Sequence, residues 1–369
     1  MKKKTIYRYP SIAAGSLMFA ALIGLGSTHS KSIRYPPTDS AILNSFNSLM
    51  NKSSNDIGIP AKTFFSAFVD NNNNKWFLTE LGIISFNGEK WTLHNENNKV
   101  PSKDLKGFAY EVNPDAPELW IASPNGATVA SLPIDTGTDA TTYHIENAAI
   151  LSNNVVKVAI GNGPLHWFGT DKGVSAFGTN KWLTPSYEEI YPGIMFQEYP
   201  ITSMATNRSG DSLYVGTDGA GIARVFRDEV DGISGASVYA QWGPIILPSD
   251  KIYSIFIASD GAKWFGTDQG IARHIGNNTL ENWTVFTTDE GLVNNFVQAI
   301  TADKKGNLWF GTKGGVSVYN GSAWTSYTIN DGLNSNNILC IAVDKDGVVW
   351  IGTDDGVNCY NSGELISYK

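Results

Sequence analysis

The clearest pattern in the chain is a short alternation of apolar and polar residues, interrupted every few positions by turn residues. Residues 296–302 alternate as a strand and lead into a turn that contains Gly306. Residues 308–312, 316–319 and 323–328 alternate in the same way, with Lys313-Gly314-Gly315 and Asn320-Gly321 between them. This stretch predicts four short antiparallel strands joined by tight turns.

The same pattern recurs along the chain, and each copy is marked by an aromatic residue followed by an apolar residue, Gly and Thr. The copies are centred on Trp76, Trp120, Trp167, Tyr214, Trp264, Trp309 and Trp350. Their spacing of 41 to 50 residues is typical of a four-stranded propeller blade. The sequence therefore predicts an all-β fold over residues 61–369: a seven-bladed β-propeller of four-stranded blades.

Aromatic residues fall at two regular places in the predicted blades. The anchor residues lie on second strands, and a further set lies on fourth strands, at Trp91, Trp182, Trp283 and Trp324. A single blade is too small to bury both faces of its sheet, so we expect these side chains to pack between neighbouring blades of the ring.

These residues carry a resemblance to a known family. The string Gly306-Asn307-Leu308-Trp309-Phe310-Gly311-Thr312-x-x-Gly315-Val316, followed by Tyr319-Asn320-Gly321, Trp324 and Asp331-Gly332-Leu333, resembles the two-component-regulator propeller repeat. The resemblance covers about residues 61–369 and is clearest in the last three blades. The resemblance implies a periplasmic sensing domain of the kind that membrane-spanning histidine kinases carry. Many of those kinases detect polysaccharide fragments. The chain shows no kinase or DNA-binding region, so we expect no direct signal transduction by this polypeptide.

The N-terminus has the pattern of a secretory signal over residues 1–30. Lys2–Lys4 precede an apolar run at residues 12–25, and Thr28-x-Ser30 offers a small-x-small cleavage site. The alternative is an uncleaved anchor. Residues 31–60 are interpreted as a linker with a short helix, or as an extra edge strand that helps to close the ring. A periplasmic or secreted location follows from the signal.

The charge of the chain narrows the range of partners. The net charge is −8, and loss of residues 1–30 would remove four basic residues and no acidic one. An acidic protein without basic runs is a poor candidate for nucleic acid or for an anionic membrane surface.

The sequence offers no convincing catalytic or metal-binding constellation. None of its five histidines has a metal-like spacing, and a Gly-x-Ser-x-Gly turn is absent. His166 is interpreted as a packed histidine, while His94 and Glu96 form a conceivable acid–base pair in a loop. The Asp-Gly turns are interpreted as hairpins and not as calcium sites. We therefore expect no catalytic residue, no metal and no cofactor.

Cys340 and Cys359 raise the question of a disulfide, because exported proteins often contain disulfides. The alignment of the repeats places them on the first and third strands of the last blade, on either side of the Trp350 strand. Two strand spacings amount to about 9–10 Å, which exceeds the reach of a disulfide. The expectation is two buried free thiols.

A ligand site is expected on the face that carries the interblade loops, where two segments deviate most from the repeat. Exposed aromatics beside carboxylates suit stacking on sugar rings or a protein surface. The candidate ligand-binding residues are Tyr187, Glu188, Tyr191, Phe196, Tyr199 and Trp242. The function expected is an exported, non-catalytic recognition module for a glycan fragment or an envelope protein. The alternatives are a propeller-fold carbohydrate lyase or hydrolase, and a structural component of envelope assembly.

Overall fold

The computed structural model describes residues 58–111, 117–135, 137–161, 165–178, 181–183, 198–210, 212–226, 234–239, 247–276 and 281–369. All of them belong to the unit Leu49–Lys369. The predicted signal at residues 1–30 and the predicted helix after Asp39 lie outside these residues, so both stay predictions.

The described chain forms seven four-stranded antiparallel sheets. Blade 1 comprises β1 (Phe64–Val69), β2 (Lys75–Thr79), β3 (Gly82–Phe86) and β4 (Trp91–His94). Blade 2 comprises β5 (Gly107–Glu111), β6 (Glu118–Ser123), β7 (Gly126–Ser131) and β8 (Ala140–Tyr143). Blade 3 comprises β9 (Val155–Ile160), β10 (His166–Thr170), β11 (Gly173–Gly178) and β12 (Lys181–Leu183). Blade 4 comprises β13 (Ile201–Thr206), β14 (Ser212–Thr217), β15 (Ile222–Phe226) and β16 (Ser234–Tyr239).

The last three blades follow the same plan. Blade 5 comprises β17 (Ile252–Ile257), β18 (Lys263–Thr267), β19 (Ile271–His274) and β20 (Trp283–Phe286). Blade 6 comprises β21 (Val297–Ala302), β22 (Leu308–Thr312), β23 (Gly315–Tyr319) and β24 (Trp324–Tyr327). Blade 7 comprises β25 (Ile338–Val343), β26 (Val349–Thr353), β27 (Gly356–Asn361) and β28 (Glu364–Tyr368). The helices among the described residues are three single 3-10 turns: η1 (Glu96–Asn98), η2 (Thr288–Glu290) and η3 (Ile329–Asp331).

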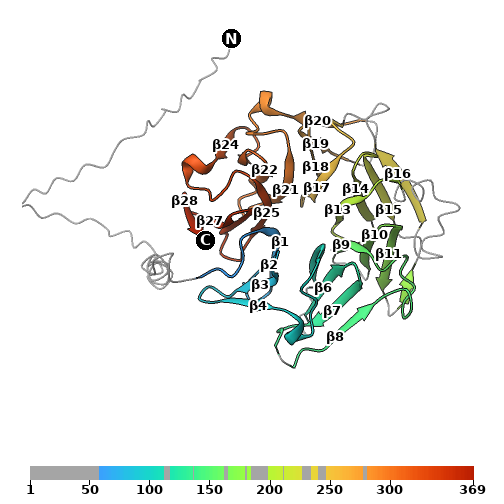
Figure 1. The fold of residues 1–369 in the computed structure, drawn as a ribbon. Coiled ribbons are helices and arrows are strands. Elements are labelled where there is room, and N and C mark those ends of the chain that lie inside the picture. Colours follow the sequence, from blue (N-terminus) through green and yellow to red (C-terminus); the bar gives the residue numbers. More distant parts are fainter. Residues whose placement is uncertain are drawn as a thin grey trace, which may run out of the picture. The chain divides into compact units, whose positions relative to one another are not determined.

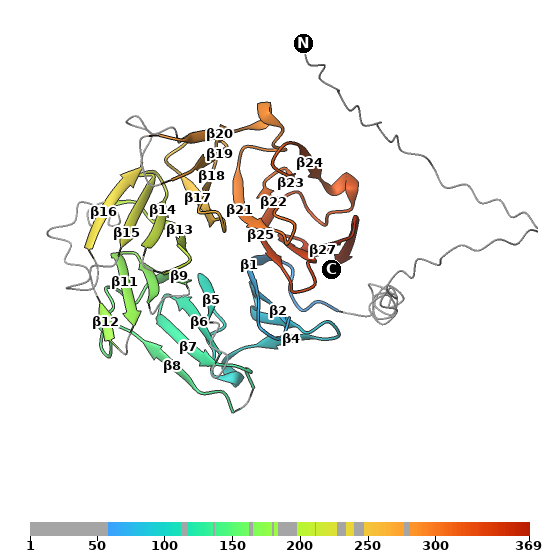
Figure 2. The same cartoon turned by 180° about the vertical axis from the view of Figure 1, so that it is seen from behind.

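The sheets stand around a common centre, with the first strand of each blade innermost (Figure 1, Figure 2). Each first strand contacts the first strand of the next blade, and β1 contacts β25 to complete the ring. The predicted seven-bladed propeller is therefore confirmed. Blades 1 and 7 are each built from one continuous stretch of the described chain, so the ring closes by packing between them and not by exchange of a described strand.

The threonine of the repeat closes the turn between the second and third strands. In all seven blades its hydroxyl, or that of Ser123 in blade 2, donates a hydrogen bond of 2.7–3.1 Å to a glycine carbonyl across the turn. Gly315, at φ +125°, shows why glycine is needed there, because other residues rarely adopt that conformation. These turns and the interblade loops lie at one end of the strands, which we call the upper face. The other turns form the lower face.

On the lower face, an aspartate stabilises the turn between the first and second strands in three blades. Asp70, Asp303 and Asp344 accept hydrogen bonds from the indole Nε1 of Trp76, Trp309 and Trp350, at 2.9, 3.1 and 3.0 Å respectively. Each also accepts from backbone N–H groups of its own turn. The Asp-to-Trp spacing of the repeat is thus a turn that fixes the anchor tryptophan.

The interblade loops after blades 5 and 6 contain capped 3-10 turns. Thr287 and Glu290 form a capping box around η2, and Thr328 and Asp331 form one around η3. The turns end at Gly291 and Gly332 in left-handed conformations, and the leucine after each glycine is buried. The Asp-Gly-Leu string therefore ends a capped turn and anchors it in the core.

The core consists of aromatic and aliphatic side chains packed between successive blades. The anchor tryptophans Trp120 and Trp167 are almost fully buried, and Trp91 of β4 packs in one cluster with Trp350 of blade 7. Cys340 on β25 and Cys359 on β27 are both buried and free, as predicted.

Candidate functional site

Of the six ligand-binding residues predicted from the sequence, the structure describes only Tyr199. Its ring packs against Gly219 in the β14–β15 turn, where an added Cβ would lie 3.2 Å from a ring carbon. The side chain is 37% exposed on the upper face. Tyr187, Glu188, Tyr191, Phe196 and Trp242 lie outside the described residues, so their part in a site stays a prediction.

The repeat places a pair of residues side by side on the upper face. One member precedes the first strand, and the other follows the threonine of the second strand. In blades 3 and 7 the pair is Asn and Asp: Asn154 Nδ2 donates to Asp171 at 3.2 Å, and Asn337 Nδ2 donates to Asp354 at 2.9 Å. In these two blades the pair ties the start of the first strand to the turn after the second strand.

The other five blades carry other pairs of residues at these two positions, and blades 5 and 6 place charged and aromatic side chains there. In blade 6 the pair is Phe296 and Lys313, and the Lys313 Nζ lies 3.7 Å from the centroid of the Phe296 ring. In blade 5 the pair is Lys251 and Asp268, but Lys251 instead forms an ion pair of 3.5 Å with Asp218 of blade 4. Asp268 Oδ1 is buried and has no hydrogen-bond partner.

Tyr253 completes this group at the upper end of β17. Its ring centroid lies 4.4 Å from that of Phe296 on the neighbouring blade. Burial and the negative charges of Asp218 and Asp268 raise the pKa of its phenol, so the hydroxyl stays protonated at neutral pH and can donate. We call the set the upper-face arc; it consists of Tyr199, Asp218, Lys251, Tyr253, Asp268, Phe296 and Lys313.

The arc combines groups that suit a hydroxyl-rich ligand. Phe296 and Tyr253 supply a paired aromatic surface, and Asp268 supplies an unused acceptor beside it. Lys251 and Lys313 lie at exposed positions and add donors. Buried polar atoms usually have a partner, so this Asp268 oxygen is an acceptor that no described group of the arc uses.

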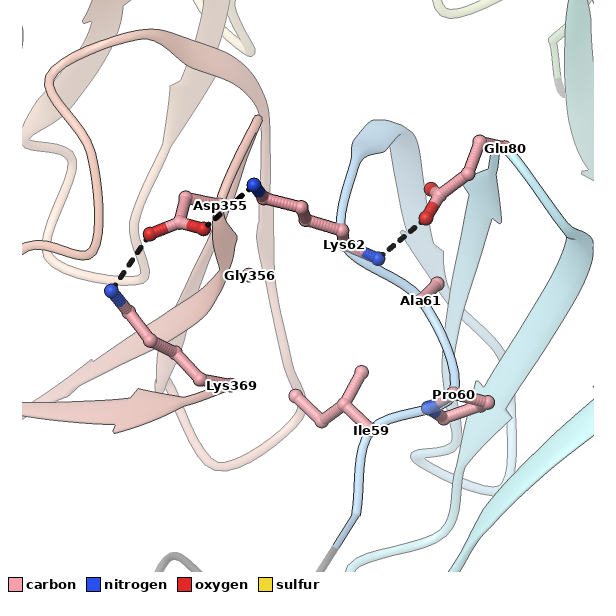
Figure 3. A pocket seen from close by; sticks show the side chains of 8 residues that line it. All are labelled: Ile59, Pro60, Ala61, Lys62, Glu80, Asp355, Gly356 and Lys369. Carbon is pink, nitrogen blue, oxygen red and sulfur yellow. Dashed lines mark hydrogen bonds and ion pairs between the residues drawn. The ribbon is translucent and has the colours of Figure 1, made fainter.

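A cavity of about 370 Å³ also opens on the upper face, between blades 7 and 1 (Figure 3). Its charged groups already pair with one another: Lys62 and Lys369 lie 3.5 and 2.8 Å from Asp355. Glu80 accepts hydrogen bonds from the backbone N–H groups of Lys62 and Thr63, at 2.6 and 2.8 Å. Because its charged groups are already paired, this cavity leaves fewer hydrogen-bonding groups free for a ligand than the upper-face arc does.

A titratable cluster that the sequence did not reveal lies on the lower face between blades 2 and 3. Glu111 and Glu118 are directly opposed on β5 and β6. Burial and the charge of Glu111 raise the pKa of Glu118. His166 Nε2 lies 3.2 Å from Glu111, and its ring stacks on Trp120 with the centroids 5.2 Å apart. His166 is packed, as expected, but it also has an acidic partner.

The conceivable acid–base pair of His94 and Glu96 is not supported. His94 is the last residue of β4 and not part of a loop, and it is only 4% exposed. It lies against Trp76 and within 2.9 Å of the Ser85 hydroxyl, while Glu96 accepts from Ser102. Burial lowers the pKa of His94 to about 4. Side chains alternate between the two faces of β4, and the His94 side chain lies on the buried side.

Within the described ranges, no group of three or more His, Cys, Asp or Glu side chains is arranged to hold a metal ion. The same part of the chain contains no helix with the length and apolarity that a membrane crossing requires.

Comparison with known families agrees with the repeat geometry. The family model described as "Two component regulator propeller" matches residues 291–314 and 332–355. Each match runs from the interblade loop through the first strand to the turn after the second strand. This chain carries two-component regulator propeller repeats. No curated protein sequence matches it significantly.

Solved structures with the same fold include extracellular domains of B. thetaiotaomicron proteins. The domain of BT3049, assigned to a hybrid two component system, is 20% identical with a TM-score of 0.65. The corresponding domain of BT4673 is 18% identical with a TM-score of 0.61. The alignments cover 82% and 83% of this chain but only 39% of each of those chains.

A streptogramin B lyase structure is 16% identical with a TM-score of 0.58, over 84% of this chain and 95% of the lyase. At these identities the likeness shows the propeller fold alone.

Proposed function

We propose that this chain is an extracytoplasmic, non-catalytic recognition domain that binds a carbohydrate at the upper-face arc. The observation that carries the proposal is the cation–aromatic group on the upper face at the boundary of blades 5 and 6. There Phe296 and Lys313 occupy the two positions, with the Lys313 Nζ over the Phe296 ring, and the Tyr253 ring lies against Phe296 at an angle of 39°. An aromatic and cationic group on the loop-bearing face of a rigid scaffold suits the recognition of a ligand.

The location and the sensor-like role are supported by the repeat family and by the predicted signal at residues 1–30. The extracellular domains of BT3049 and BT4673 share the fold. Fold likeness is an association and not a demonstration of function, so the proposal rests chiefly on the arc.

The predicted residues of the two deviant segments extend the proposed site. Residues 184–200 connect β12 to β13, and residues 240–251 connect β16 to β17, so both connections join strand ends at the upper face. We propose that Tyr187, Glu188, Tyr191, Phe196 and Trp242 contribute to the same site as Tyr199. Loss of binding in Tyr191→Ala and Trp242→Ala variants would support their inclusion.

A thermal-shift screen against neutral and acidic oligosaccharides tests the proposal. A ligand at a hundred times its Kd stabilises the folded protein by about 2.7 kcal/mol. Tyr253→Ala and Phe296→Ala should each weaken binding of the best oligosaccharide by about tenfold, because each removes part of the stacking surface. Ile275→Ala is the matched control, since Ile275 is 42% exposed at the lower end of the same blade.

Two outcomes of the thermal-shift screen would count against the proposal. If an oligosaccharide binds and both arc variants bind it as tightly as the wild-type protein, the arc is not the site. If no oligosaccharide binds, carbohydrate recognition is rejected and a protein partner becomes the leading alternative.

A second candidate function, a carbohydrate-active enzyme, is favoured by one observation. Glu111 and Glu118 form a carboxyl pair in which the pKa of Glu118 is raised, with His166 beside it. Paired carboxyls with separated pKa values are typical of glycoside hydrolysis. Release of reducing ends from a polysaccharide by the wild-type protein, and its loss in Glu118→Gln, would establish this function.

A further inference from the structure

A cavity of about 390 Å³ lies on the lower face between blades 5 and 6, at the opposite end of the sheets from the upper-face arc. It is bounded by the β17–β18, β21–β22 and β23–β24 turns. The residues that matter for its chemistry are Ala258, Asp260, Trp264, Arg273, Tyr319 and Asn320. Its volume is within the range of about 300–1,000 Å³ that small-molecule sites occupy.

Arg273 is a cation without an anionic partner in this cavity. It is opposite Trp264 in the β18–β19 register, and its guanidinium carbon lies 5.1 Å from the indole centroid. Its Nε is buried and has no hydrogen-bond partner. None of the ion pairs between described residues includes Arg273. A half-buried guanidinium that lacks a carboxylate has hydrogen-bonding capacity to spare.

The repeat shows which carboxylate is missing. At the boundary of blades 7 and 1, Lys75 Nζ lies 5.2 Å from the Trp350 ring and 3.6 Å from Asp344. Asp344 also accepts the indole hydrogen bond of Trp350, six residues later in the chain. In blade 5 the position six residues before Trp264 is Ala258, so this indole lacks the aspartate. The cation over the indole also differs: Arg273 lies on β19 of the same blade, opposite Trp264, whereas the neighbouring blade carries Leu308 at the position of Lys75. The cavity therefore keeps the tryptophan of the repeat without its aspartate, and Arg273 places a cation beside that indole.

We infer that this cavity binds the carboxylate of a small polar ligand, which takes the place of the missing aspartate between Arg273 and the edge of Trp264. A guanidinium can donate two parallel hydrogen bonds to a carboxylate. Asn320 and Tyr319 supply a polar wall on the side of blade 6. The ligand class is a carboxylic acid of about monosaccharide size, and both sugar acids and simple dicarboxylates have this chemistry.

Calorimetric titration of the full chain with D-glucuronate, succinate and D-glucose tests the inference. Glucuronate should bind, and glucose, which has the ring without the carboxylate, should bind at least about tenfold more weakly. Equal binding of succinate would assign the site to the carboxylate alone, whereas weak binding of succinate would show that the sugar ring is recognised as well. Arg273→Gln should lower the affinity for glucuronate by about tenfold or more.

Ala258→Asp is the sharper variant, because it restores the aspartate of the repeat. The new carboxylate should pair with Arg273 and accept from Trp264 Nε1, and it should abolish glucuronate binding without loss of thermal stability. Lys305→Gln, at an exposed position in the neighbouring blade boundary, is the control and should bind normally. The inference is overturned if neither acid binds, if glucose binds as tightly as glucuronate, or if both variants bind like the wild-type protein.

Discussion

At the scale of single residues, the most consequential contact is the ion pair of Lys75 and Asp344 across the boundary of blades 1 and 7. Their side chains are 7% and 3% exposed, and the Lys75 Nζ also lies over the Trp350 and Phe86 rings. Asp344 accepts from Trp350 Nε1 and from two backbone N–H groups. Because the Asp344 carboxylate accepts from all of these donors, its removal leaves Lys75 buried without a counter-charge and leaves N–H groups of the turn without an acceptor.

Asp344→Ala should lower the free energy of unfolding by about 3–5 kcal/mol, the usual cost of breaking a buried ion pair by removal of one partner. Glu364→Ala, at an exposed position of β28 in the same blade, should change it by less than about 0.5 kcal/mol. Denaturant titration of the two variants measures the difference. Equal midpoints would show that the pair contributes nothing to closure.

His94 gives the fold a specific dependence on pH. Its folded-state pKa is about 4, below the unfolded value of 6.5, so the unfolded state binds a proton first as the pH falls. Stability from this residue is complete above pH 6.5 and declines between pH 6.5 and 4, by up to about 3 kcal/mol. The slope of unfolding free energy against pH in this window should be smaller in His94→Gln than in the wild-type protein. Identical slopes would contradict the assignment.

At the scale of elements, the recurring residues of the repeat string are mainly those that the turns require, and the strands between them vary more in composition. The predicted strands of blade 6 agree with β21–β24 to within a residue or so at most ends, because Gly306, Gly315 and Gly321 mark where turns must form. From the sequence, Asp331-Gly332-Leu333 is only part of the string that resembles the family repeat. Its capping box became visible in the structure, where Thr328 and Asp331 bond reciprocally.

Thr328→Ala should destabilise the protein by about 1 kcal/mol, because the first turn of η3 loses the hydroxyl that accepts its N–H groups. Asn330→Ala, at an exposed position of the same turn, is the matched control and should stay within about 0.5 kcal/mol of wild type. Chemical denaturation measures both. A control variant as unstable as Thr328→Ala would mean that the loop is sensitive to any change and that the cap is not the cause.

At the scale of the whole molecule, the ring has one boundary that differs from the other six. Blades 1 and 7 are far apart in the chain, so packing and hydrogen bonds hold them without a short connecting loop. Phe64 and Trp91 pack with Trp350, and Cys340 Sγ donates to the Phe64 carbonyl at 3.2 Å. Local opening is expected to begin where the fewest covalent constraints act.

Thiol labelling reports on this opening. Burial raises the pKa of both cysteine thiols to about 12, so the native protein should react very slowly at pH 8, and both should react after denaturation. In a Cys359→Ser background, Phe64→Ala should speed labelling of Cys340 far more than Phe168→Ala, which empties an equally buried position between blades 2 and 3. Equal acceleration by the two variants would show that labelling follows global unfolding.

The sequence predicted the number of blades, the anchor positions and the free thiols, because each depends on local spacing. It could not reveal the upper-face arc, since Tyr253 and Phe296 meet only when two blades stand side by side. A signal was present: Lys313 interrupts the series of aspartates in the upper turns, and Phe296 replaces the asparagine that precedes the strand in blades 3 and 7. The Glu111–Glu118–His166 cluster has no comparable signal, because its members come from two blades.

Hydrogen–deuterium exchange with the oligosaccharide that gives the largest thermal shift would locate binding directly. Protection of backbone amides at residues 199–202, 218–221, 250–253, 295–298 and 313–315 would place the carbohydrate on the upper-face arc. Protection confined to lower-face turns such as residues 258–261 and 303–306, with the upper turns unchanged, would contradict it.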